Sequence, residues 1–260
     1  VSLAGYPILD DNEYQPGTYS VRLSGYDPET LDYQTIADNA RQAVSENKLE
    51  FTDLSWNVKD FSSHFLRSFG NNANHLWSNS AANTSKERSQ MEIKGRQSIL
   101  RAYRFLRTQA RLEDIKIELS ALECGIRETV RIHGEKIISL DDYQSGQIWA
   151  DSICYAFYPI DLHNKKDGVK PVPLAKSVVP TVPLAALIPK GADNMLAAGR
   201  CISSDRLANS ALRVQASCMA TGQVAGAAAA LAVKQNCSVK ELSIEKLKYL
   251  LKQHNAIVPE

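Results

Sequence analysis

The sequence predicts an α+β fold that combines helices with a mixed or antiparallel sheet. Short extended pieces open the chain in residues 1–26, and residues 115–119 and 130–138 also read as strands. Long helical patterns occupy residues 84–109 and 214–234. No glycine-rich turn joins a strand to a helix, so the sequence does not encode a complete dinucleotide-binding domain.

The opening strands surround a turn at residues 16–17, and the second strand alternates apolar with polar side chains. Asp27 then offers a helix cap, and Pro28 suits the first helical turn. We therefore expect a surface helix that begins here and ends near Asn47. The apolar positions of the second strand are Tyr19, Val21 and Leu23.

Residues 51–83 mix aromatic side chains with asparagines and serines and show no clear period. Such a stretch can line a pocket, because aromatic faces stack on a flat or sugar-like ligand while amides bind its hydroxyls. Aromatic packing beneath a long loop is the alternative, and the pattern alone favours it. The aromatic and histidine positions are Phe51, Trp56, Phe61, His64, Phe65, Phe69, His75 and Trp77.

The helix predicted at residues 84–109 opens on a capping box, in which Thr84 and Glu87 satisfy backbone donors reciprocally. Arginines and lysines form its outer face. They could meet phosphates, but the near-neutral charge of the chain favours a solvated surface.

The middle of the chain is divided by glycine and proline. Gly134 interrupts the second predicted strand and suggests a bulge, while Ser139 caps a short helix that ends at Gly146. Residues 159–189 hold six of the ten prolines. Strands there are therefore restricted to sheet edges and to a hairpin around residues 167–168.

The segment 214–234 consists almost entirely of small residues, which let a helix approach its neighbours closely, so we expect this helix to be buried. A final amphipathic helix follows at residues 243–253. The small residues are Ala216, Ser217, Ala220, Thr221, Gly222, Ala225 and Gly226.

Composition restricts the partners. Thirty basic and 29 acidic residues leave a net charge of +1, which argues against nucleic acid and anionic lipid. The longest run without a polar side chain, residues 224–233, is too short to cross a bilayer, so we expect no membrane partner. Five widely spaced cysteines argue against a zinc site or a disulfide framework, and no metal is predicted. A small-molecule substrate is the expected partner.

Three ordered segments of the last third carry a specific motif: MLAAGRCIS at 195–203, LRV at 212–214 and CMATGQVAG at 218–226. Together they resemble the carboxy-terminal signature of the bacterial FAD-dependent oxidoreductase family, which has a glutathione-reductase-like flavin fold. Further matches lie upstream in the same order, so the resemblance covers nearly the whole chain. They are residues 19–27, 125–134 and 158–163.

In that family an inserted substrate-side domain splits the flavin domain. The resemblance implies that residues 1–188 are the inserted domain and that residues 189–260 are the returning strand and helices of the FAD-binding domain. Residues 2–5 resemble the end of the short helix before the insertion. The chain thus resembles the carboxy-terminal portion of a longer flavoenzyme. We expect it to bind FAD weakly or not at all, because the phosphate-binding turn is not encoded.

The resemblance also implies a cofactor site. A helix that begins after residue 214 would offer amide donors and a partial positive charge to reduced flavin. Gly199 would allow close backbone approach, and the polar side chains nearby would bind the ribityl or phosphate portion. The implied cofactor-binding residues are Gly199, Arg200, Ser203, Arg213, Val214, Gln215 and Ala216.

On the substrate side, His163 is suited to accept a proton when a hydroxyl-bearing carbon loses hydride to flavin, because its unperturbed pKa lies near neutrality. Arg127 could orient or polarise an oxygen. The alternatives are a structural ion pair of Arg127 with Glu128 and a hydrogen-bonded hairpin role for His163. Cys201 fits a packed thiol better than a redox dithiol.

Three hypotheses follow. The leading one is an oxidoreductase that binds FAD non-covalently and acts on a small polar, sugar-like substrate. The second is a ligand- or partner-binding module without flavin. The third is a cofactor-free hydrolase that uses Cys154 or Ser152 with His163. Whichever holds, a small-residue helix left without sheet partners is expected to promote self-association.

Overall fold

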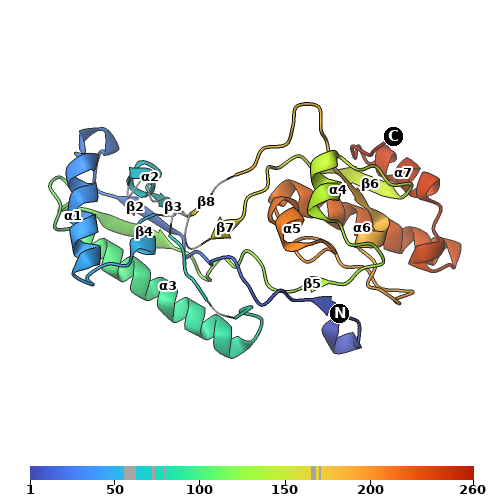
Figure 1. The fold of residues 1–260 in the computed structure, drawn as a ribbon, viewed down its shortest axis with the longest axis horizontal. Helices are drawn as coiled ribbons and strands as arrows, with labels where there is room; N and C mark the ends of the chain where they lie inside the picture. The colour runs from blue at the N-terminus through green and yellow to red at the C-terminus, as the bar shows by residue number, and fades with distance from the viewer. Residues whose placement is uncertain (56–62, 72–73, 79, 165–167, 170) are drawn as a thin grey trace. The chain divides into compact units, whose positions relative to one another are not determined.

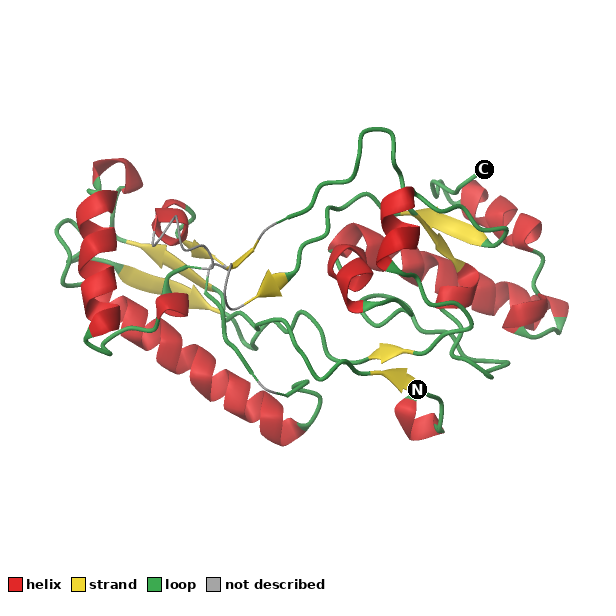
Figure 2. Cartoon of the chain, viewed as in Figure 1, coloured by secondary structure: helices red, strands yellow, loops and turns green. Residues whose placement is uncertain are grey.

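The computed structural model describes the chain except for residues 56–62, 72–73, 79, 165–167 and 170. The described residues form seven α-helices and four small antiparallel sheets (Figures 1 and 2), which confirms the predicted α+β class. Trp56, Phe61 and the predicted turn residue Asp167 lie outside this part of the chain.

The chain divides into two compact units. The first unit contains Val1–Asp11, Glu128–Leu162 and Lys170–Glu260, and the second contains Asn12–Arg127 and His163–Val169. The first unit therefore joins residues from both sides of residue 188. The predicted boundary at residue 188 separates an inserted domain from the FAD-binding domain, and compact units do not test such a boundary. It stays a prediction.

The second unit is built on the antiparallel sheet β3–β2–β4, and helices α1 and α3 contribute to the same core. Val21 and Leu23 of β2 are buried, as the alternation of apolar and polar residues predicts. They belong to the same hydrophobic cluster as Ile99 of α3. The bounds are β2 Val21–Ser24, α1 Tyr33–Ser45, α2 Ser63–Arg67, β3 Gly70–Asn71, α3 Ser85–Leu106, β4 Lys116–Ser120, β7 His163–Asn164 and β8 Gly168–Val169.

In the first unit α6 packs against β6 and α7. Strand β6 pairs with β9, and β1 pairs with β5. The bounds are β1 Ile8–Leu9, β5 Arg131–Ile132, α4 Leu140–Ser145, β6 Ser152–Tyr155, β9 Thr181–Pro183, α5 Arg206–Leu212, α6 Gln215–Gln235 and α7 Ile244–Gln253. Five 3₁₀-helices complete the described chain: Ser2–Ala4, Pro28–Thr30, Phe51–Asp53, Leu184–Ala186 and Val239–Glu241.

Two predicted boundaries were wrong. Asp27 and Pro28 open only the 3₁₀-helix Pro28–Thr30, and α1 begins later because Asp32 provides the side-chain cap. Only Arg131–Ile132 (β5) of the strand expected at residues 130–138 is a strand. The backbone of residues 133–138 makes its hydrogen bonds with residues outside the strands instead of with a neighbouring strand.

Helix α6 is less buried than expected. Only one face is covered, while Met219 and Val233 are 74% and 83% exposed. By length and composition α6 is the one helix of the described chain that could cross a membrane, but core helices of soluble proteins pass the same test. The covered face of α6 contacts β6 and α7.

Candidate functional site

The amino end of α6 has no side-chain cap in the described part of the chain. Val214 occupies the N-cap position with an extended backbone, and its apolar side chain cannot accept a hydrogen bond. By contrast Thr84 caps α3 and Asp205 caps α5, and both side chains accept a hydrogen bond from a first-turn amide. Gln215 and Ala216, the first helical residues of α6, are exposed. In any α-helix the first amides point out of the amino end without partners inside the helix, and here they lie at the positive end of a 21-residue helix.

Two further features surround this helix end. Ser217 is 2% exposed, and its Oγ has no hydrogen-bond partner among the described residues. Gly199 has φ of +87°, a conformation that favours glycine, and a Cβ built there would meet only Cys218 Sγ, at 4.0 Å. The space beside the first turn of α6 is therefore open, and any side chain at position 199 would occupy it.

Thr221 connects the glycine loop to the helix. Its Oγ1 accepts from the Gly199 amide at 3.1 Å and lies 2.9 Å from the Ser217 carbonyl oxygen, to which it donates. This fixes the loop on the second turn of α6. Thr221 was named among the small residues of the segment but was not predicted as a site residue.

The other predicted cofactor residues differ in accessibility. Arg200 is exposed. Arg213 is mostly buried, and its Nη2 donates to the Asp161 carbonyl oxygen at 3.1 Å and pairs with the Asp161 carboxylate at 3.4 Å. Burial lowers the pKa of Arg213, and the Asp161 carboxylate opposes that shift. Ser203 is fully buried, and its Oγ accepts from the Gly134 amide at 2.9 Å. The hydroxyl of Ser203 thus holds a neighbouring loop, and its role toward a cofactor stays a prediction.

A second cluster lies in the second unit, around two histidines. His163 Nδ1 and His75 Nε2 are 2.8 Å apart, and both residues are buried. The His163 amide donates to Gln15 Oε1 at 3.2 Å. Burial, followed by the charges of Arg127 and His163, lowers the pKa of His75 to about 2, so this imidazole is neutral at physiological pH.

Arg127 holds the backbone near this pair. Its Nη1 donates to the Pro16 carbonyl oxygen at 2.6 Å and to Thr18 Oγ1 at 2.8 Å. Glu128 Oε1 accepts from Arg206 Nε at 3.2 Å in the first unit. The two hydrogen bonds of Arg127 give it a structural role, because they position residues 16–18. Its positive charge also lowers the pKa of His75.

His75 also lines a hollow of about 270 Å³. The ring of Trp77 stands nearly perpendicular to His75, with centroids 5.8 Å apart. Arg101 is fixed by two hydrogen bonds to Asp53, of 2.9 and 2.8 Å. The lining residues are Glu50, His75, Leu76, Trp77, Lys94, Gln97 and Arg101.

His75 and Trp77 belong to the aromatic, polar stretch of residues 51–83, but the sequence pattern gives neither of them a role. The signal was their closeness to each other in that stretch. His163, the partner of His75, lies 88 residues away in the chain, and no local sequence pattern indicates that the two histidines pair.

The hydrolase hypothesis finds no support here. Ser152 is fully buried, and its Oγ is 2.7 Å from Thr181 Oγ1 and accepts from the Trp149 amide at 2.9 Å. Burial raises the pKa of the Cys154 thiol to about 12, which leaves almost no thiolate. Cys201 also has a raised pKa through burial, as a packed thiol should.

Comparison with known proteins gives one match. A family model described as FAD dependent oxidoreductase matches residues 6–251. No curated protein and no solved structure matches the chain. The matched range includes both the amino end of α6 and the histidine pair.

Proposed function

Because the chain belongs to the FAD dependent oxidoreductase family, we propose that it is the carboxy-terminal part of a flavoenzyme that transfers hydride between FAD and a small polar, sugar-like substrate. The observation that carries the proposal is the uncapped amino end of α6 beside the buried Ser217 hydroxyl and the open space at Gly199. An orphaned donor, outward amides and room beside them suit a flat, electron-rich group.

Each predicted cofactor-binding residue then has its own role. When bound, FAD supplies the hydride acceptor. The amides of Gln215 and Ala216 stabilise negative charge at their helix end, and the exposed Arg200 binds the ribityl or phosphate portion. Arg213 acts through Asp161, which it orients. The glutathione-reductase-like architecture, a bacterial source and a split flavin domain belong to the same proposal.

His163 accepts the substrate proton. With Nδ1–H donating to His75 Nε2, the Nε2 atom of His163 carries a lone pair and takes the hydroxyl proton as the substrate carbon loses hydride. His75 remains neutral because its pKa is about 2, so it supports the imidazolium form of His163 by accepting its hydrogen bond. Arg127 holds residues 16–18, next to Gln15, which accepts from the His163 amide.

The hollow beside His75 is the proposed substrate-binding region. Trp77 offers an aromatic face, Gln97 an amide, and Lys94 and Glu50 opposite charges. Its volume of about 270 Å³ suits a molecule smaller than the drug-sized ligands that fill roughly 300–1,000 Å³. Together these groups match a small polyhydroxylated compound.

The test is a titration with FAD, followed by absorption and by quenching of flavin fluorescence. We expect weak binding by the 260-residue chain, tighter binding by the protein with its amino-terminal dinucleotide-binding part, and a further tenfold loss in Gly199→Val. The matched control is Gly191→Val, because Gly191 also has positive φ and open space around it but lies away from α6. Equal affinity of both variants would refute the cofactor site.

A further inference from the structure

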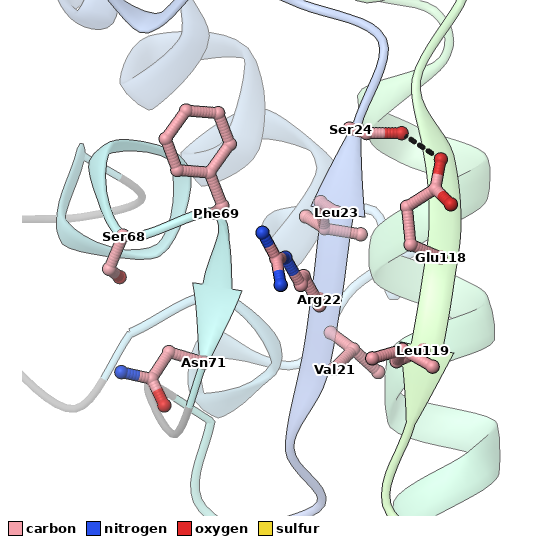
Figure 3. Close-up of a pocket in the computed structure, with 9 residues that line it drawn as sticks. All are labelled: Val21, Arg22, Leu23, Ser24, Ser68, Phe69, Asn71, Glu118 and Leu119. Carbon is pink, nitrogen blue, oxygen red and sulfur yellow. Dashed lines mark hydrogen bonds between the residues drawn. The ribbon is translucent and has the colours of Figure 1, made fainter.

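A hollow of about 780 Å³ lies on the β3–β2–β4 sheet of the second unit (Figure 3). It shares no residue with the hollow beside His75. Nine residues line it: Val21, Arg22, Leu23, Ser24, Ser68, Phe69, Asn71, Glu118 and Leu119.

A β-bulge places Glu118 in this hollow. Arg22 pairs with Leu119 across the sheet and Leu23 pairs with Ile117, so Glu118 is the extra residue of β4 without a partner in β2. Its carboxylate accepts from the Ser24 hydroxyl, and Figure 3 shows it on the same side of the sheet as the Arg22 guanidinium. Bulges commonly redirect a side chain toward a binding site.

The opposite wall is an unusual piece of backbone. Phe69, Gly70 and Asn71 have φ of +53°, +94° and +52° in succession. A Cβ on Gly70 would lie 2.6 Å from the Val21 carbonyl oxygen, so glycine is required there. Phe69 is 39% exposed, and its ring lies 5.5 Å from that of Tyr26. An aromatic residue in the left-handed region is rare, and strained residues of this kind cluster at active sites, ligand clamps and switch regions.

The charged side chains of the hollow, Arg22 and Glu118, are available to bind a ligand. Within the described residues Arg22 forms no ion pair, and the contact of Glu118 is with a neutral hydroxyl. Opposite charges that face each other directly across neighbouring strands stabilise a sheet. Here the bulge keeps them apart beside an exposed ring and the 64% exposed side chain of Leu119.

We propose that this hollow binds a small zwitterion with a hydrophobic side chain, of the α-amino acid type. The carboxylate of the ligand binds Arg22, the ammonium group binds Glu118 beside Ser24, and the side chain packs on Phe69 and Leu119. A singly charged ligand would leave one of the two protein charges uncompensated, whereas a zwitterion satisfies both.

The test is calorimetric titration of the whole chain with three matched probes: phenylalanine, 3-phenylpropionate, which lacks the ammonium group, and phenethylamine, which lacks the carboxylate. We expect saturable binding of phenylalanine and at least tenfold weaker binding of both analogues. Arg22→Met should weaken phenylalanine at least tenfold and leave phenethylamine unchanged. Glu118→Gln should weaken phenylalanine and leave 3-phenylpropionate unchanged.

Arg41→Met is the control, because Arg41 is an exposed arginine of the same unit that lies outside the hollow. Thermal melts of each variant establish that it is folded, and Arg22→Lys, which keeps the charge, should retain part of the affinity. Absence of saturable binding by phenylalanine would overturn the proposal. So would equal affinity for 3-phenylpropionate, or losses in Arg22→Met no larger than those in Arg41→Met. None of these measurements requires flavin, so they succeed or fail independently of the proposed redox function.

Discussion

His75 joins His163 across 88 residues of chain and remains neutral in the folded protein. The pKa of His75 falls from its usual value near 6.5 to about 2 on folding, because burial and the charges of Arg127 and His163 disfavour the imidazolium form. The unfolded chain therefore binds one more proton at position 75 between these two pH values.

The first prediction follows from that difference. As the pH falls below 6.5, the free energy of unfolding should decrease by about 1.4 kcal/mol per pH unit through His75 alone. His75→Asn removes this group, so urea denaturation between pH 7 and 5 should show a shallower pH dependence than in the parent chain. His64→Asn, which changes an exposed histidine, serves as the control. An unchanged slope in His75→Asn would contradict the assignment.

Ser217 gives a second prediction at this scale. Its buried Oγ lacks a partner in the described chain, and such a group costs about 1–3 kcal/mol. Ser217→Ala should therefore raise the free energy of unfolding by about 1 kcal/mol and weaken FAD binding at the same time. Ser45→Ala, at an exposed helix position, should change neither quantity. A stabilised variant with undiminished FAD affinity would show that Ser217 does not serve the cofactor.

Among the elements, the beginning of α3 could be read directly from the chain, as could those of α4 at Ser139 and of α7 at Ser243. The capping box of Thr84 and Glu87 is present, and α3 runs over Ser85–Leu106 close to the expected range. Reciprocal capping is local, so it needs no tertiary information. The start of α1 was misread because Asp27 and Asp32 are both suitable caps, and only the packing of the helix decides between them.

The third prediction concerns this cap. Thr84→Ala should lower the free energy of unfolding by about 1 kcal/mol, because the Glu87 amide loses its acceptor. Equilibrium urea denaturation measures the change. Lys86→Ala, at an exposed position in the first turn of α3, should keep the free energy of unfolding within about 0.5 kcal/mol of the parent value. A loss no greater than that in Lys86→Ala would show that the box contributes nothing to stability.

Helix α6 carries an exposed face of small and apolar residues. Met219 and Val233 are largely exposed, and a Cβ on Gly222 or Gly226 would meet no other atom within 4 Å. The buried face of the same helix contacts β6 and α7. A smooth apolar face of this kind is suited to another layer of protein.

The fourth prediction is that the chain self-associates through this face in a concentration-dependent manner. Light scattering should give a mass above that of the 28.7 kDa monomer, and Met219→Lys with Val233→Lys should reduce it. Leu122→Lys changes an equally exposed apolar residue of the other unit and should have no effect. A monodisperse monomer at every concentration would contradict the prediction.

At the scale of the whole molecule, each proposed site is contained in one compact unit. The predicted cofactor residues all belong to the first unit, while the histidine pair and both described hollows belong to the second. The chain passes from the second unit to the first at residue 128 and returns at residue 163. Arg127 and His163, the two predicted catalytic residues, are the last and first residues of their segments.

The sequence by itself determined the α+β class, the cap and extent of α3, and the family through the ordered motifs of residues 195–226. These features depend on residues close together in the chain. Only the tertiary structure decided that His75 meets His163, that Ser203 is buried against Gly134, and that Arg22 and Glu118 face one hollow. Each of these arrangements brings together residues more than 65 positions apart, and its formation depends on how the core packs rather than on any local preference.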